Sequence, residues 1–165
     1  MKYTLSVFTF LISLLLFAQG DKMNPEKITN VFFKNKTINL VGMQSDRSLY
    51  PDMKAGNMVV FHYTKRHAEN PAMSDDEVSE SVMFEVDATW NSFIFMKKLP
   101  MSKATYNLGC FCVERGYFNI TGGYIKGKKL ANGNYRIDAD ATITFNNGTE
   151  KAIKFKGEFS PANEG

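Results

Sequence analysis

Residues 135–145 read YRIDADATITF, and in this stretch every odd position is apolar and every even position is polar. Alternation with a period of two over this length predicts a β-strand with one buried face. Residues 146–149 (NNGT) follow, and Asn and Gly tolerate the positive φ angles of a tight hairpin turn. A second alternating run then places Ile153, Phe155 and Phe159 inward. With a third strand expected at 118–126, the C-terminal part of the chain is predicted to be a three-stranded antiparallel meander.

The rest of the chain shows shorter strand-like runs separated by turn residues, and we expect strands at 31–33, 37–41, 58–63, 82–86, 90–96 and 108–113. Helical periodicity is nearly absent, although the capping-box order at residues 74–77 (SDDE) predicts one or two helical turns. The fold class is therefore all-β. About eight antiparallel strands are expected, either as a β-sandwich or as a closed up-and-down, calycin-like barrel.

The N-terminus has the pattern of a secretory signal peptide. Lys2 is followed by an apolar stretch without charge at 5–17, and residues 18–20 (AQG) offer small residues for cleavage. The apolar stretch is shorter than the roughly 20 residues that span a bilayer as a helix. We expect a signal peptide at 1–20 and a single β domain at 21–165, secreted or periplasmic, with no transmembrane segment in the mature chain.

The charge of the chain is relevant to whether it could bind nucleic acids. The formal net charge is +3, and the basic residues are scattered in pairs rather than gathered in a stripe. Binding to a nucleic-acid backbone requires several converging cations. We therefore expect no nucleic-acid partner; the partner is either a small ligand or an extracellular macromolecule.

Four short stretches resemble the C-terminal meander of uncharacterised secreted or lipoprotein β-domains of Gram-negative bacteria. They are residues 119–123 (NITGG), 133–137 (GNYRI), 147–148 (NG) and 155–159 (FKGEF). The resemblance implies a β-domain and carries no activity to any residue. The likeness to lipocalins is architectural only, because the Gly-x-Trp of that family is missing and the single tryptophan is Trp90.

Residues that could carry chemistry are few. No Gly-x-Ser-x-Gly elbow occurs, and His62 and His67 are not spaced to bind one metal ion. Asp138 and Asp140 share one face of a strand, but that face is the solvated one. We therefore expect no catalytic residues, no metal site and no cofactor, and the protein is not expected to be an enzyme.

Cys110 and Cys112 are the only cysteines and are separated by Phe111. In a straight strand their Cα atoms would lie about 6.6–6.8 Å apart, at the limit of what a disulfide spans. The pair is a candidate disulfide or redox pair, or a soft-metal site, or simply two small buried residues. We expect a buried strand here, with Phe111 on the opposite face and neither thiol catalytic.

Aromatic residues at 90–95 are the candidate ligand-lining side chains, namely Trp90, Phe93 and Phe95. Large aromatics in a β-domain also form the core, and the pattern alone does not distinguish the two roles. The function expected from these features is non-enzymatic binding of a small apolar or glycan ligand. The alternative is an envelope or extracellular interaction protein that binds a macromolecule through an edge strand or loop.

Overall fold

A computed structural model describes residues 23–42, 49–71, 73, 75–96, 99–100 and 103–162 of the chain. The predicted signal peptide at 1–20 lies outside the described residues. The strands are β1 (Lys27–Gly42), β2 (Leu49–Arg66), β3 (Ser79–Asp87), β4 (Ser92–Phe95), β5 (Ala104–Gly109), β6 (Gly116–Lys129), β7 (Tyr135–Thr144) and β8 (Glu150–Pro161). The predicted all-β class with eight strands is confirmed. No helix long and apolar enough to cross a membrane is found in the described ranges.

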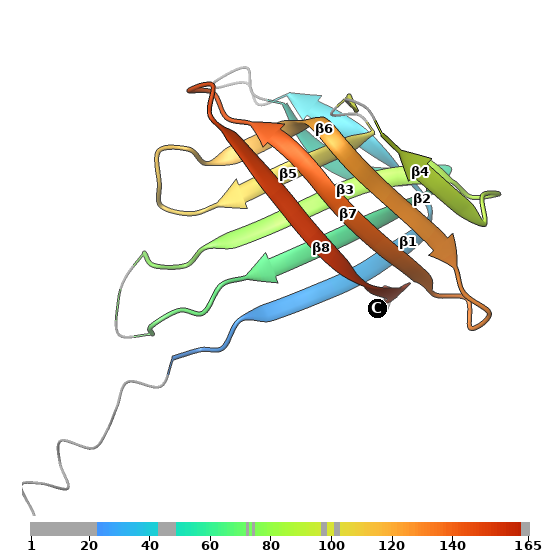
Figure 1. Ribbon diagram of the computed structural model, residues 1–165, viewed down its shortest axis with the longest axis horizontal. Coiled ribbons are helices and arrows are strands. Elements are labelled where there is room, and N and C mark those ends of the chain that lie inside the picture. Colours follow the sequence, from blue (N-terminus) through green and yellow to red (C-terminus); the bar gives the residue numbers. More distant parts are fainter. Residues whose placement is uncertain are drawn as a thin grey trace, which may run out of the picture.

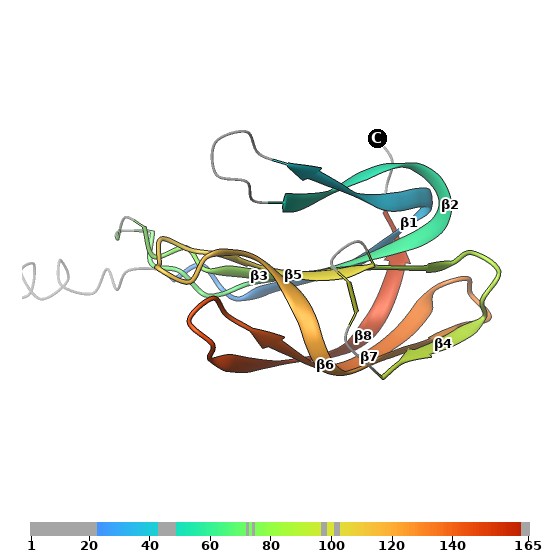
Figure 2. The ribbon, with the colours of Figure 1, turned by 90° about the horizontal axis from the view of Figure 1, so that it is seen from above.

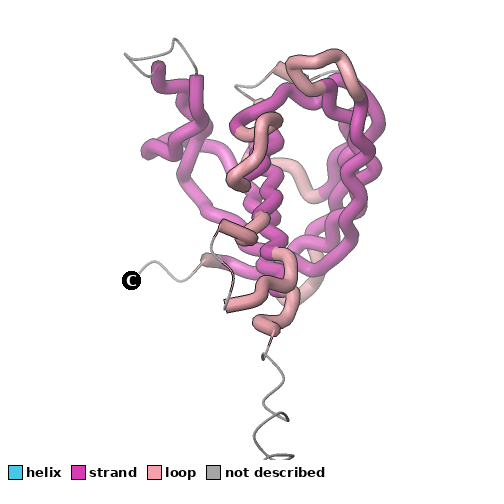
Figure 3. The backbone as a smooth tube through the Cα atoms, turned by 90° about the vertical axis from the view of Figure 1, so that its left-hand side faces the viewer, coloured by secondary structure: helices cyan, strands magenta, loops and turns pink. Residues whose placement is uncertain are grey.

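The strands form one mixed sheet whose order is β4-β6-β5-β3-β2-β1-β8-β7, and β6 also pairs with β7. This second pairing closes a ring of strands. Figure 1 shows β6, β7 and β8 crossing in front of β1, β2, β3 and β5, and Figure 3 shows the ring flattened in cross-section. All strand pairs are antiparallel except β1 and β8, which meet in parallel over two residue pairs. The arrangement shares features of the predicted sandwich and of the predicted barrel.

The C-terminal meander is confirmed with its predicted register. β6 pairs with β7, and β7 pairs with β8, in antiparallel order. The odd positions of β7 from Tyr135 to Ile143 are buried, as are Ile153, Phe155 and Phe159 of β8. Gly148 has the positive φ angle (84°) that the hairpin turn requires. The alternation therefore predicted both the strands and their buried face.

A glycine at position 123 allows β6 to pass from one layer to the other. The first part of β6 pairs with β5 and the later part with β7, and the register shifts between Ile120 and Gly122. Gly123 has a φ of +81°, and a Cβ atom at this position would lie 2.0 Å from the carbonyl oxygen of Asp140. Only glycine fits this bulge, which bends the strand between the two layers.

The interior of the ring is filled by side chains from both layers. Phe61 of β2 is fully buried at its centre, and its ring lies 5.0–5.9 Å from those of Phe32, Phe84, Phe93, Tyr135 and Phe159. These distances are typical of packed aromatic side chains. The interior of the ring is therefore a packed core.

The outer halves of β1 and β2 form an arm, residues 36–42 and 49–58, that curls back over the outer face of the sheet (Figure 2). Under the arm lies Glu85 of β3, which accepts hydrogen bonds of 2.7 Å from Thr37 Oγ1 and from the Ile38 N–H, and which also binds Lys103. Ile38 and Val60 are buried there as well, outside the main core. The arm thus encloses a small second core.

Three expectations about local structure were wrong. Residues 31–33 and 37–41 belong to one strand, because the expected turn at 34–36 is a bulge in the pairing with β2. The expected strand at 108–113 ends at Gly109 and continues as an exposed loop. No helical turn forms at 75–77, where Asp75 has a φ of +67°, outside the right-handed helical region.

Candidate ligand-binding groove

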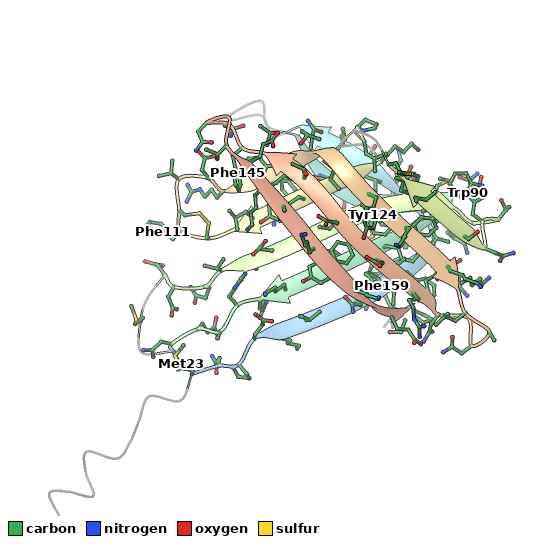
Figure 4. The ribbon with its side chains drawn as sticks, viewed as in Figure 1. Met23, Trp90, Phe111, Tyr124, Phe145 and Phe159 are labelled. Carbon is green, nitrogen blue, oxygen red and sulfur yellow. A yellow bond between two sulfur atoms is a disulfide. The ribbon has the colours of Figure 1, made fainter. Side chains whose placement is uncertain are left out.

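A short turn between β3 and β4 presents Trp90 to solvent. Asp87 Oδ1 accepts hydrogen bonds from the backbone N–H (2.8 Å) and the hydroxyl (2.6 Å) of Thr89. The backbone N–H of Trp90 then donates a hydrogen bond to the Asp87 carbonyl oxygen at 3.1 Å. The hydrogen bonds from Thr89 hold the pKa of Asp87 below its ordinary value. The indole of Trp90 remains 45% exposed, at the end of the molecule opposite to Phe111 (Figure 4).

The strand after this turn, β4, lies along β6 and alternates between core and solvent. Phe93 points inward and is only 7% exposed, whereas Ile94 points outward and is 57% exposed. Gly127 of β6 allows this contact, because a Cβ atom there would lie 2.3 Å from the Phe93 ring. β4 therefore anchors its inner face in the core and leaves an apolar outer face beside Trp90.

A groove of about 920 Å³ runs over this outer face. One side is formed by Trp90 and Ile94, with Leu130 also contributing an apolar side chain. The floor consists of the outward side chains of β6, β7 and β8, and its charged members are Lys126, Lys128, Arg136, Asp138 and Lys156. The groove thus combines an exposed aromatic ring with four cations and one carboxylate.

Asp138 is the centre of the polar contacts in the groove. It accepts a hydrogen bond from the Tyr124 hydroxyl at 3.2 Å, and the Nζ atoms of Lys126 and Lys156 lie 3.5 and 4.0 Å from its carboxylate. The Nζ atom of Lys126 also lies 4.8 Å from the centre of the Tyr124 ring. These contacts hold the floor of the groove in a defined arrangement.

A second, shallower depression of about 300 Å³ shares Asp138 and Lys156 with the groove. It extends the surface to Tyr124, Asp140 and Lys154, the last two of which form an ion pair of 2.9 Å. Neighbouring strands lie about 4.8 Å apart, so the four paired strands β4, β6, β7 and β8 span about 14 Å. The two depressions therefore form a continuous track that begins at Trp90 beside β4 and reaches Lys154 and Lys156 on β8, with Tyr124 of β6 along its side.

The three predicted ligand-lining aromatics occupy different positions. Trp90 lies at the edge of the groove, and Phe93 belongs to the core but also contributes to the groove floor. Phe95 packs partly buried against the core, with its ring 6.4 Å from that of Trp90. The sequence analysis does not predict the charged floor, because it interprets the even positions of β7 and β8 only as a solvated face and ends the preceding strand at 126, before Lys128.

A second cluster of polar groups closes one end of the ring. Glu80 of β3 accepts hydrogen bonds from the Tyr106 hydroxyl and from Lys151 Nζ, both at 2.8 Å, and lies 2.7 Å from His67 Nε2. Burial alone would raise the pKa of Glu80, but the hydrogen bonds from Lys151, Tyr106 and His67 outweigh it and lower the pKa. Glu80 is thus an ionised group whose hydrogen-bonding capacity is filled, and we infer that this cluster stabilises the fold.

The cysteine pair lies in the loop between β5 and β6, not in a buried strand. Cys110 and Cys112 form a disulfide, and the bend of the chain brings their Cα atoms to 5.3 Å, well within the range that a disulfide spans. Phe111 is 77% exposed and Val113 is 96% exposed. The expected burial of this segment was wrong, because its apolar residues lie at the tip of a loop.

The Cys110–Cys112 disulfide should contribute little to stability. It closes a loop with a single intervening residue, and β5 and β6 already pair on either side at Leu108 and Gly116. Changing both cysteines to Ser should lower the free energy of unfolding by only about 1–2 kcal/mol, since the loop-closure entropy of so short a loop is small. Urea unfolding of this variant and of the unreduced protein measures the difference. A loss above about 4 kcal/mol would contradict this prediction.

Comparisons of the chain with models of protein families, with curated proteins and with solved structures found no match. The function therefore has to be argued from the groove itself.

Proposed function

We propose that the protein is a secreted, non-enzymatic binding protein that holds a glycan on the outer face of β4, β6, β7 and β8. The observation that carries the proposal is the continuous track with Trp90 exposed at its edge and a charged floor beneath. The packed interior favours the outer face over a ligand site inside the ring.

The chemistry of the track fits a sugar chain. A pyranose ring has one apolar face of C–H groups, which packs against an exposed aromatic ring such as that of Trp90, and its hydroxyls need polar partners around the rim. Asp138 and Lys156 provide an acceptor and a donor in the shared part of the two depressions. A track that crosses several strands suits an extended chain of sugar units better than a compact ligand.

Binding without turnover is favoured by the state of the carboxylates. The two glutamates with the most partners, Glu80 and Glu85, have lowered pKa values and lie within networks that support the fold. Asp138 and Asp140 lie on the outer face, each with a lysine partner. A glycosidase needs one carboxyl group that keeps its proton, which requires an environment that disfavours the charge.

Replacing Trp90 by Ala should weaken glycan binding about 10- to 100-fold, because exposed aromatic anchors provide much of the affinity of such surfaces. Calorimetry of the unmodified protein with a panel of soluble polysaccharides first identifies a polysaccharide that binds. The affinity of the variant is then measured with that polysaccharide. The matched control is Phe111→Ala, which removes an exposed aromatic ring at the opposite end of the molecule and should leave the affinity unchanged. Equal losses in both variants, or no binding to any polysaccharide, would reject the proposal.

The alternative, binding of a macromolecule through an edge strand or loop, is favoured by one observation. The loop after β5 exposes two apolar side chains, Phe111 and Val113, close together at one end of the molecule, and exposed apolar surface of this kind is what a macromolecular partner covers. Under this alternative the two aromatic variants exchange roles: Phe111→Ala loses the interaction and Trp90→Ala keeps it.

A further inference from the structure

Two cations face each other in the groove without a carboxylate between them. Lys128 of β6 and Arg136 of β7 are directly opposite in the strand pairing, and both line the groove and are exposed. Like charges at directly opposed positions of a strand pair destabilise it. The pairing of β6 with β7 therefore places two like charges side by side on the outer face.

The neighbouring carboxylates have hydrogen-bond and ion-pair partners of their own. Asp138 has Lys126, Lys156 and Tyr124 as partners. Glu158, opposite Arg136 on β8, accepts hydrogen bonds from the side-chain amides of Asn134 (2.7 Å) and Asn132 (3.0 Å). Among the described residues, neither Lys128 nor Arg136 takes part in an ion pair. Together with the hydrogen bonds from Asn134 and Asn132, the charge of Arg136 holds the pKa of Glu158 below its ordinary value, so Arg136 shares its charge with this carboxylate. Lys128 has only Ser92 and Arg136 opposite it in the strand pairing, and its charge is left for a ligand.

The surroundings of the pair are those of a recognition site. Ser92 of β4, which also lines the groove, pairs directly with Lys128 of β6, and Lys128 pairs in turn with Arg136 of β7. A hydroxyl, an ammonium group and a guanidinium group therefore lie in a row across three strands. An arginine fork binds a carboxylate or sulfate through two parallel hydrogen bonds, and a lysine adds a point charge. Trp90 lines the same groove and would contact the ring that carries the anionic group.

We propose that Lys128 and Arg136 bind the anionic substituent of the ligand, so that the protein selects acidic glycans. This inference rests on the proposed glycan binding and adds the chemical class of the sugar. The substituent is a carboxylate, as in a uronic acid, or a sulfate ester, because both offer the geometry that the pair recognises.

The test compares acidic polymers with their neutral counterparts. The probes are polygalacturonate and its carboxyl-reduced form, and a sulfated polysaccharide and its desulfated form, each titrated into the protein by calorimetry. The inference expects at least tenfold tighter binding of one acidic polymer than of its neutral form. The double variant Lys128→Gln, Arg136→Gln should remove this preference and change the affinity for the neutral form less than twofold.

The control variant is Lys54→Gln, which removes one exposed cation from the arm, outside the groove. It should preserve the preference. Thermal unfolding checks that the double variant is folded, and its midpoint should be unchanged or slightly raised, since the repulsion between the opposed cations is gone.

The outcomes separate the inference from the proposed function. If acidic and neutral polymers bind equally tightly and Trp90→Ala loses this binding, the proposed glycan binding stands and the inference about acidic glycans is overturned. Binding of neither kind of polymer overturns both. Equal loss of acid binding in Lys54→Gln, or equally tight binding of a single-stranded DNA oligonucleotide, would show general attraction of polyanions and would also overturn the inference.

Discussion

Replacing Phe61 by Ala should lower the free energy of unfolding by about 3–5 kcal/mol, the range expected for a buried phenylalanine. The void cannot close by the shift of one neighbour, because the five rings around Phe61 come from β1, β3, β4, β7 and β8 and thus from both layers. Urea unfolding followed by tryptophan fluorescence measures the change.

The matched control for this prediction is Phe111→Ala. It removes the same side chain from a position that is 77% exposed, and it should change the free energy of unfolding by about 0.5 kcal/mol or less. Similar losses in the two variants would mean that the ring of strands has no packed centre at Phe61.

Replacing Glu85 by Gln should lower the free energy of unfolding by about 2–3 kcal/mol, the value of hydrogen bonds to a buried charged group. The side chain is 1% exposed, and its carboxylate accepts hydrogen bonds from Thr37, Ile38 and Lys103. The amide has one acceptor oxygen in place of two and turns a donor toward these donors. The control is Glu26→Gln, which affects the exposed ion pair with Lys65 and should change stability by less than about 1 kcal/mol.

Glu85 also predicts a dependence of stability on pH. Burial alone would raise its pKa, but the hydrogen bonds from Lys103, Ile38 and Thr37 outweigh it, so the folded pKa lies below the ordinary value of 4.5. A lowered pKa stabilises the fold fully above the unfolded pKa, and this stabilisation is lost as the pH falls through the folded pKa. The fall in unfolding free energy between pH 7 and about pH 3.5 should be smaller in Glu85→Gln than in the unmodified protein. An identical fall in both would contradict the assignment.

The sequence predicted those parts of the fold that depend on local patterns. β7 and β8 alternate strictly and are joined by an Asn-Gly turn, so their existence, pairing and buried face could all be read from neighbouring residues. β1 was split into two strands because Asn35, with a φ of +55°, resembles a turn residue. Its bulge is determined by the pairing with β2, which a local pattern does not contain.

The cysteine loop and the groove were missed for different physical reasons. Around Cys110 both faces of the expected strand were apolar, and a run of this kind does not distinguish a buried strand from an exposed apolar loop. The charges at Lys128 and Arg136 were visible, but their direct opposition depends on the register between β6 and β7. Trp90 lines the same groove as Lys128 and Arg136 because β4, which follows Trp90, pairs with β6 rather than with β3 or β5, its neighbours in the sequence.

The parallel pairing of β1 with β8 has a consequence for how the chain folds. Val31 and Phe32 pair with Ser160 and Pro161, and the Ala162 N–H donates to the Phe32 carbonyl oxygen at 2.9 Å. These contacts join the first and last strands, and contacts between distant parts of a sequence make folding slow. During synthesis, Phe61 at the centre of the core lacks its contact with Phe159 until β8 has left the ribosome. The core can therefore be completed only after β8 has been synthesised.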